Sequence, residues 1–243
     1  MKFDKIINSQ IDVFNHVKRS ITANSSTLLT YFNQHCFNIY YKNEEYKKLI
    51  DNNFTIYLDG IGMYLSLKMF TQKSITKFNA SDLNEKILNY LSKEKIGTYF
   101  LGGDFDKSMW NNTLLTKGIV SLGYKNGYQD IIDEQLLFSE LKAVNPKVVV
   151  IGLGVPKQEL LGYKISEILN SSVIICVGNF LEFYFGTKKR APFFLRDSGF
   201  EWLFRLFTEP KRLWKRYIFG IPLFFYRILR IYFHKNQTYE DVS

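Results

Sequence analysis

The chain has 243 residues, of which 46% are hydrophobic and 23% are charged, and its formal net charge at pH 7 is +9. This composition excludes an intrinsically disordered chain, and the length suits one α/β domain with an appendage. The two cysteines and three histidines lack metal-ligand spacing, and the most apolar run is broken by arginines and a proline, so we expect neither a metal site nor a spanning helix.

Four apolar segments have the composition of buried β-strands, and each runs into a glycine or an aspartate. They are rich in β-branched and aromatic residues and lie at 54–58, 97–101, 147–151 and 172–177. Three segments between them have the three- and four-residue apolar spacing of helices, at 82–92, 133–143 and 157–169. This alternation predicts an α/β, Rossmann-like fold, with a mostly parallel sheet covered by helices.

The last quarter of the chain carries the whole charge imbalance. Residues 188–235 contain twelve Lys and Arg against three acids, while the remainder is neutral. We expect helical segments there at 209–217 and 222–233. The basic residues of the first segment are predicted to share one face: Lys211, Arg212, Lys215 and Arg216. The sequence thus divides into an α/β domain, 1–187, and a basic, aromatic helical appendage, 188–243.

Basic residues beside aromatic ones suit the boundary between headgroups and acyl chains of an anionic membrane. Arg227 and Arg230 show this pattern in the second appendage segment. We therefore expect the protein to lie on a membrane surface. The alternative is a helical pair that packs its aromatic rings on the body and leaves its charges in water. A nucleic-acid partner is not expected, because no DNA- or RNA-reading motif is present.

Residues 152–159, Gly-Leu-Gly-Val-Pro-Lys-Gln-Glu, follow the third predicted strand. Gly152 and Gly154 let the backbone approach a ligand, and a proline at the start of a helix leaves an N-terminus that favours anions. Lys157 and Gln158 would then face a diphosphate or a sugar. The alternative is an ordinary strand-to-helix turn. A dinucleotide fingerprint is not expected, because the third glycine is missing.

Two acidic patterns stand at other strand ends. Asp59, between Leu58 and Gly60, can accept a proton from a substrate hydroxyl as a general base, or it can be a turn aspartate that bonds its own backbone. Asp104 and Asp106 form a DxD, which in some transferases holds a divalent metal. Here a helix cap is the favoured reading, so no metal is assigned.

The order of these motifs resembles the WecG/TagA/CpsF glycosyltransferases, glycosyltransferase family 26. The resemblance spans about residues 30–233. Its marks are Asp59-Gly60-Ile61-Gly62, Asn79-Ala80-Ser81-Asp82-Leu83, Phe100-Leu101-Gly102-Gly103, Asn126-Gly127-Tyr128, residues 152–159, Lys189-Arg190-Ala191-Pro192 and Glu201 to Leu206 with Glu209-Pro210.

The resemblance implies roles for individual residues. Asp59 matches the family's proposed general base. Positions in the substrate pocket are Asn33, Gln158, Glu182 and the glycines of the strand-end loops, Gly102, Gly103, Gly152 and Gly154; Gly127 and Tyr128 match a loop near the nucleotide. Lys77 stands where relatives carry arginine. Arg205, Arg212 and Lys215 match basic positions of an appendage that docks on the membrane in relatives.

Three departures from the family pattern lie in this pocket. Tyr31-Phe32-Asn33 replaces Thr-x-Asn, with Thr30 one place early, so either Thr30 or Tyr31 takes the threonine's place. Glu182 replaces an aspartate, and Asn179 replaces a glycine. These changes concern the identity of the sugar, while the class of reaction is the same.

By resemblance, the protein moves a sugar from a UDP-sugar to an undecaprenyl-diphosphate-linked sugar during teichoic acid or capsule assembly. The transfer is expected to invert the anomeric centre without a metal or other cofactor, on the cytoplasmic face of the cell membrane. A non-catalytic basic membrane- or nucleic-acid-binding protein and a metal-dependent DxD transferase are the alternatives. The sequence leaves open whether the chain forms a homo-oligomer.

Overall fold

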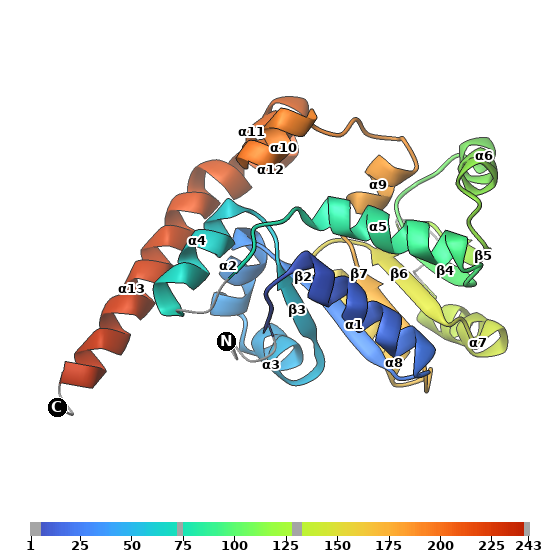
Figure 1. Ribbon diagram of the computed structural model, residues 1–243, viewed down its shortest axis with the longest axis horizontal. Helices are drawn as coiled ribbons and strands as arrows, with labels where there is room; N and C mark the ends of the chain where they lie inside the picture. Colours follow the sequence, from blue (N-terminus) through green and yellow to red (C-terminus); the bar gives the residue numbers. More distant parts are fainter. Residues whose placement is uncertain (1–5, 72–74, 128–132, 241–243) are drawn as a thin grey trace.

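The computed structural model describes residues 6–71, 75–127 and 133–240, of which 235–240 are described by their backbone only. At its centre is a seven-stranded sheet with strand order β1-β3-β2-β7-β6-β4-β5 (Figure 1). All strand pairs among the described residues are parallel. The strands are β1 (Ile6–Ile7), β2 (Thr27–Phe32), β3 (Thr55–Leu58), β4 (Thr98–Gly102), β5 (Ser121–Lys125), β6 (Val148–Gly152) and β7 (Val173–Cys176). The predicted fold class is confirmed.

The four predicted strands correspond to β3, β4, β6 and β7, and three others were not predicted. β1 has only two residues, and β2 ends at Asn33 without the glycine or aspartate loop that marked its neighbours. β5 is a half-buried edge strand with Gly123 at its centre. A Cβ at Gly123 would lie 2.3 Å from the ring of Tyr99, so the glycine makes room for this ring.

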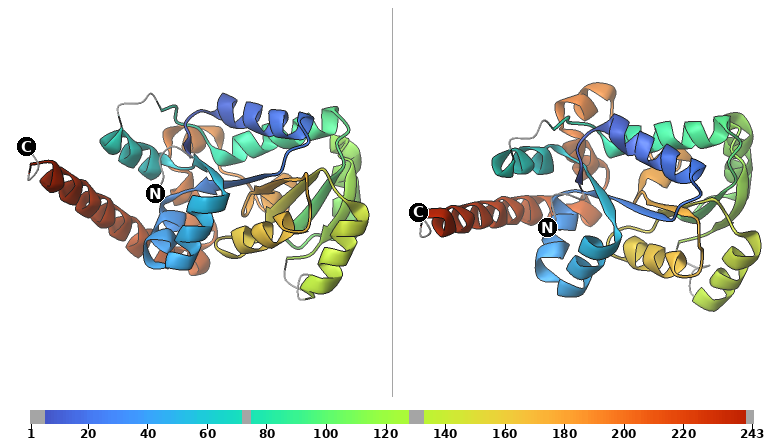
Figure 2. Two further views of the ribbon diagram at one scale, coloured as in Figure 1. Left: turned by 90° about the horizontal axis from the view of Figure 1, so that it is seen from below. Right: turned by 60° about the horizontal axis from the view of Figure 1, so that its bottom comes forward.

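Helices cover both faces of the sheet (Figure 2). One face carries α1 (Gln10–Thr22), α5 (Ala80–Lys93), α6 (Lys107–Lys117) and α9 (Phe180–Tyr184). The other carries α2 (Gln34–Lys42), α3 (Glu44–Asn53), α4 (Ile61–Phe70), α7 (Glu134–Val144) and α8 (Lys157–Ser166). Successive residues of β6 point to opposite faces of the sheet. Val148 and Val150 belong to the core under α1 and α5, and Val149 and Ile151 belong to the core under α2 and α8. Burial on both faces explains why such strands are continuously apolar.

The three predicted helices are α5, α7 and α8, with small shifts at their ends. Helix α5 begins two residues before the predicted start at Asp82. Asn79 caps it, because its side chain accepts from the backbone N–H groups of Ser81 and Asp82. The helix after Pro156 begins as expected at Lys157 but ends at Ser166.

The C-terminal segment is helical throughout most of its length. Its elements are α10 (Phe193–Ser198), α11 (Glu201–Thr208), α12 (Pro210–Trp214), a π-helical turn η2 (Lys215–Phe219) and α13 (Gly220–Glu240). The two predicted helical segments are therefore joined end to end through η2. None of the helices in the described ranges has both the length and the apolar character needed to cross a bilayer.

Helix α13 packs along α2. Phe224 is fully buried and Ile228 is 4% exposed, and both belong to the core on that face of the sheet. Arg227 is also buried: its Nη1 donates to the backbone oxygen of Asn38 at 3.0 Å and to Asn38 Oδ1 at 2.8 Å. The expected placement of Arg227 at a membrane boundary is thus wrong. This side of α13 packs on the body, as the alternative reading proposed.

Ion pairs hold the first part of the appendage to α5. Arg190 contacts Asp82 at 2.6 Å and Glu85 at 3.0 Å. Arg196, at the end of α10, contacts the same Asp82 oxygen. The side chain of Asn79 donates to Glu201 Oε2 at 2.5 Å. Helices α10 and α11 consequently lie over the N-terminus of α5, beyond the carboxyl edge of the sheet.

The topology creates a crevice between β4 and β6. The chain leaves β4 for α6 on one face of the sheet and leaves the neighbouring β6 for α8 on the other. Where two adjacent strands send their connections to opposite faces, the loops separate and leave room for a ligand. The loops at this switch point contain Gly102, Gly103, Gly152 and Gly154, as the sequence indicated.

Candidate active site

A cavity of about 480 Å³ opens beyond β2 and β3, between the body and the appendage. We call it the Asp59 cavity. Polar lining residues from the body are Asn33, Asp59, Lys77 and Asn79, and those from the appendage are Arg196, Glu201, Trp202, Arg205 and Arg216. The predicted base thus lies in a cavity that the C-terminal segment closes on one side.

Asp59 is held by elements outside its own turn. Its backbone N–H donates to Phe32 O at 3.0 Å, which fixes the end of β3 against β2. Its Oδ1 accepts from the backbone N–H of Ala80, the first residue of α5, at 3.2 Å. The side chain of Asn33, which also caps α2, forms a hydrogen bond with the same carboxylate. The described hydrogen bonds therefore orient the carboxylate and do not form a self-capping turn.

Burial raises the pKa of the Asp59 carboxyl, and the negative charge of Glu201 raises it further. The positive charge of Arg205 and the hydrogen bonds from Ala80 and Asn33 act in the opposite direction, and the balance stays above the ordinary value. A carboxylate with a raised pKa is a stronger base, better matched to proton transfer near neutral pH.

Arg205, on α11, brings a buried positive charge to the Asp59 cavity. Its Nη2 lies 2.8 Å from Glu201 Oε1, and its guanidinium lies 4.8 Å from the centre of the Phe183 ring. The charges of Glu201, Tyr217 and Asp59 raise its pKa against the effect of burial. Its Nε is buried and has no hydrogen-bond partner.

Arg216, in the π-helical turn, also faces this cavity. Its Nε is buried without a partner, and among the described residues it has no carboxylate within salt-bridge distance. Burial and the charge of Arg216 together lower the pKa of His35 to about 4, so this charge acts on the first turn of α2. A partly buried cation without a carboxylate partner can bind a phosphate group.

A second cavity, of about 450 Å³, lies at the switch point of the sheet. We call it the glycine-loop cavity. Its lining includes the predicted residues Gly103, Gly127, Gly152 and Glu182, and in addition Leu153, Lys157, Lys164 and Asn179. Lys164 is paired with Glu134, another lining residue, at 2.7 Å, so backbone at the strand ends and Lys157 are the groups of this cavity that can contact an anion.

The glycines of this cavity are required by close backbone approach. Gly102 has a positive φ of 113°, and a Cβ there would lie 2.5 Å from Gly152 O. A Cβ on Gly127 would lie 2.9 Å from the Cα of Gly102, and one on Gly152 would lie 2.8 Å from Gly178 O. Neighbouring loops thus touch through their backbones, which leaves the space above them open. Gly154 differs, because nothing lies within 4 Å of its Cβ position.

A small hollow of about 40 Å³ connects the two cavities. It shares Asn33, Asp59, Arg205 and Arg216 with the Asp59 cavity and Asn179 with the glycine-loop cavity. Asp59 therefore lines both the Asp59 cavity and the hollow that lies toward the glycine-loop cavity.

Gln158 lies beneath these cavities and does not line them. It is fully buried; its Oε1 accepts from the backbone N–H of Gly178 at 2.9 Å, and its Nε2 donates to Glu159 Oε1 at 2.8 Å. The same Glu159 oxygen accepts from Thr30 Oγ1 at 2.8 Å. Burial raises the pKa of Glu159 to about 7. In this structure Gln158 positions the Gly178 loop.

Thr30 and Tyr31 have different surroundings, although they are adjacent in β2. Thr30 is fully buried and points to Glu159, away from the ligand spaces. Tyr31 lines the connecting hollow, and its hydroxyl lies 2.5 Å from the Cβ position of Gly178. Of these two residues, only Tyr31 can contact a ligand.

A comparison with known families identifies the family of the chain. A model of the glycosyl transferase WecG/TagA/CpsF family matches residues 2–238. The chain belongs to this family. This WecG/TagA/CpsF protein is a glycosyltransferase of cell-surface polysaccharide biosynthesis, and its family uses nucleotide-sugar donors and lipid-linked acceptors.

The structure places the other predicted residues of this glycosyltransferase as follows. Lys77 lines the Asp59 cavity and donates from Nζ to Asp197 O. Glu182 pairs with Lys188 at 2.6 Å. Arg212 reaches the connecting hollow and donates to Glu209 at 2.7 Å. Lys215 is exposed outside both cavities. Tyr128 lies outside the described residues.

The predicted single basic face of the appendage is wrong. Lys211 and Lys215 are exposed, whereas Arg216 is turned into the Asp59 cavity and Arg212 reaches the connecting hollow. Residues four apart behave alike, since Arg212 and Arg216 both line the hollow, so the four residues form two neighbouring rows with different surroundings.

The DxD residues have structural partners in this glycosyltransferase. Asp106 caps α6, accepting from the backbone N–H groups of Ser108 at 2.8 Å and Met109 at 3.1 Å, as predicted. Asp104 Oδ1 accepts from the Asn126 side chain. No group of three or more His, Cys, Asp or Glu side chains in the described ranges is arranged to hold a metal ion.

Four residues that line the Asp59 cavity were not predicted as site residues from the sequence: Arg216, Glu201, Asn79 and Arg196. Glu201 and Asn79 belong to the family motifs, which could have identified them. Arg216 belongs to the basic cluster of the appendage, but the sequence pattern did not distinguish it from the exposed Lys215 beside it.

Proposed function

We propose that this glycosyltransferase moves a hexosyl unit, such as N-acetylmannosamine, from a UDP-sugar to a sugar on undecaprenyl diphosphate, in teichoic acid or capsule assembly. The UDP-sugar occupies the glycine-loop cavity, with its sugar directed through the connecting hollow. The lipid-linked acceptor occupies the Asp59 cavity. The shared lining of the hollow supports this assignment, because it brings both reacting groups to Asp59.

In the proposed reaction, Asp59 takes the proton of the acceptor hydroxyl while its oxygen attacks the anomeric carbon. The bond from this carbon to the UDP oxygen breaks on the opposite side, so the configuration inverts and UDP leaves. Arg205 stabilises the negative charge that develops on the diphosphate of the leaving UDP. The single observation that carries the proposal is the position of Asp59: oriented by Asn33 and Ala80, with a raised pKa, beside Arg205 and Arg216.

The replacement Asp59→Asn tests this role. The amide keeps the size of the side chain but cannot accept the proton, so we expect turnover to fall on the order of 10²–10⁴-fold. UDP release is measured with a panel of UDP-sugars and a lipid-diphosphate-sugar acceptor in vesicles. Asp133→Asn is the matched control, because asparagine also caps α7 well. Near-normal turnover of the Asp59 variant would reject the assignment.

We further propose that the transfer needs no divalent metal. The engagement of Asp106 as a helix cap and the presence of two arginines at the hollow support this view. Activity is expected to be unchanged when EDTA is added in excess over Mg²⁺ and Mn²⁺. A loss that added metal restores would instead assign a metal to the diphosphate.

We propose that the protein acts at the inner face of the cell membrane. The appendage exposes aromatic side chains, with Phe193, Phe194, Phe207 and Phe219 between 62% and 77% exposed. Lys211 and Lys215 are exposed near them. This combination suits an anionic lipid surface, and contact there would hold the Asp59 cavity beside a lipid-borne acceptor.

A further inference from the structure

Helix α4 has an exposed apolar stripe in addition to its buried face. Met63 and Leu67 enter the core, while Ile61, Leu65 and Met69 are 37%, 47% and 41% exposed. These three residues follow one another at intervals of four, so they lie on one side of the helix. A surface helix normally has polar residues at such positions, and a helix that is apolar on both sides indicates a further apolar partner.

Helix α13 has a matching stripe. Phe225, Leu229 and Phe233 are 40%, 44% and 61% exposed and also recur at intervals of four. The ring of Phe225 reaches within 3.9 Å of the Cβ position of Gly62, near the start of α4.

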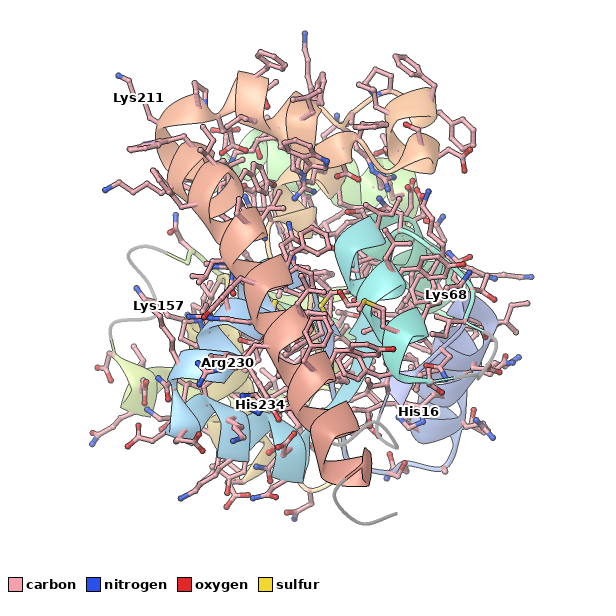
Figure 3. All side chains as sticks on the ribbon, turned by 90° about the vertical axis from the view of Figure 1, so that its left-hand side faces the viewer. His16, Lys68, Lys157, Lys211, Arg230 and His234 are labelled. Carbon is pink, nitrogen blue, oxygen red and sulfur yellow. The ribbon has the colours of Figure 1, made fainter. Side chains whose placement is uncertain are left out.

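The two helices lie side by side and run in the same direction away from the Asp59 cavity (Figure 3). The rings of Tyr232 and Phe70, at the far end of α4, are 5.9 Å apart. The figure shows Lys68 on the flank of α4 away from α13, and Arg230 beside the flank of α13 away from α4. The charged residues therefore leave the surface between the helices apolar.

This apolar track, formed by the stripes of α4 and α13, continues directly from the Asp59 cavity. Ile61 and Phe225, the first residues of the two stripes, line that cavity together with Arg205 and Arg216. From Ile61 to Met69 the helix rises about 12 Å. Cations at one end and a linear apolar surface leading away from them match an amphiphile with an anionic head and a hydrocarbon tail.

We propose that the apolar track binds the first isoprenoid units of the lipid-linked acceptor, while its diphosphate lies at Arg216. This inference rests on the proposed function, because it extends the acceptor site from the sugar to the lipid. The track determines which lipid carrier is accepted, in addition to any contact that the appendage makes with the bilayer.

The test uses two probes that share a diphosphate head, farnesyl diphosphate and isopentenyl diphosphate, with the full-length protein in vesicle-free buffer. Binding is measured by calorimetry below the critical micelle concentration of the longer probe. Farnesyl diphosphate is expected to bind at least tenfold more tightly. The double variant Leu65→Gln/Leu229→Gln is expected to remove most of this advantage and to leave the Kd of isopentenyl diphosphate unchanged.

The matched control is Leu115→Gln on α6, whose side chain is 82% exposed and far from the track; it should change neither Kd. Equal affinities for the two probes, or a double variant that keeps the discrimination, would overturn the proposal. A double variant that binds vesicles more weakly but keeps the affinities for both probes would also overturn the proposal, because the two stripes would then contact the bilayer and not the acceptor.

The test of the apolar track and the test of Asp59 as the base can fail independently of each other. Asp59→Asn is expected to keep the ratio of the two affinities, because Asp59 does not contact the tail. If the Asp59 variant keeps its turnover and still binds farnesyl diphosphate more tightly, the assignment of Asp59 as the base is rejected and the apolar track is retained. If the Asp59 variant is inactive and the protein binds the two diphosphates equally, the base assignment is retained and the apolar track is rejected.

Discussion

Three side chains set the chemistry at the centre of the site. Asp59 is the proposed base; its pKa is raised by burial and by Glu201, and the positive charge of Arg205 acts in the opposite direction. Glu201 is itself held by Arg205 at 2.8 Å and by Asn79 at 2.5 Å. Glu201 is therefore a positioning residue: it fixes Arg205 and adjusts the basicity of Asp59.

The replacement Glu201→Gln is expected to lower the pKa of Asp59. It removes a negative neighbour and frees Arg205, and both changes favour the ionised carboxylate. Asp59 must be ionised to accept a proton, so the acid limb of the kcat/KM profile should move to lower pH. The measurement is kcat/KM from pH 4 to 8. Glu85→Gln, which removes a carboxylate outside the cavity, is the control, and a shift of the limb to higher pH would contradict the argument.

At the scale of elements, α13 decides the shape of the Asp59 cavity by packing on the body. Phe224 is fully buried and meets the ring of Phe37 edge to face, with ring centres 5.2 Å apart. Arg227 supports the same contact through Asn38 and lies 4.6 Å from the ring of Tyr41. One helix thus has a face in the core and an exposed face with the apolar stripe.

The replacement Phe224→Ala is expected to destabilise the protein by about 3–5 kcal/mol, the usual cost of removing a buried phenyl ring. Phe233→Ala, on the same helix but 61% exposed, should cost less than about 0.5 kcal/mol. Both values come from urea unfolding followed by circular dichroism. Equal effects would mean that α13 does not pack on α2 in solution.

For the whole molecule, the proposed function links the two cavities to a position at the membrane. The glycine-loop cavity, the proposed donor site, lies at the switch point of the sheet, and the Asp59 cavity, the proposed acceptor site, lies between the sheet edge and the appendage. The appendage contributes Arg205 and Arg216 to the Asp59 cavity and exposes aromatic and basic residues on its outer surface. If the proposal is correct, an acceptor that stays in the bilayer reaches Asp59 without leaving the membrane.

The double variant Lys211→Ala/Lys215→Ala tests this orientation. Each lysine near an anionic leaflet contributes about 1 kcal/mol, so binding to vesicles that contain phosphatidylglycerol should weaken roughly 30-fold. Cosedimentation is measured at low and at high salt, since screening should reduce the difference. Lys93→Ala/Lys142→Ala removes two lysines from helix ends at the opposite edge of the sheet. Equal losses in the two double variants would show a nonspecific charge effect.

The sequence alone determined the fold class, four of the five inner strands of the described sheet and the position of Asp59 at a strand end. These features depend on local patterns, namely continuous apolar runs and the glycines that close backbone contacts require. The edge strands escaped prediction because β1 is short and β5 is only half-buried. The sequence also placed Gly103, Gly127, Gly152 and Glu182 in one ligand space, and the structure brings them together in the glycine-loop cavity.

Only the tertiary structure decided which direction the long polar side chains take. Arg216 faces the cavity while its neighbour Lys215 faces outward, Arg227 fastens α13 to α2, and Gln158 supports a loop from below. Residue type and spacing do not distinguish these roles, because a cation or an amide serves equally in water, in an ion pair or beside a ligand. The surroundings that select among them come from segments far away in the chain, which meet only when it folds.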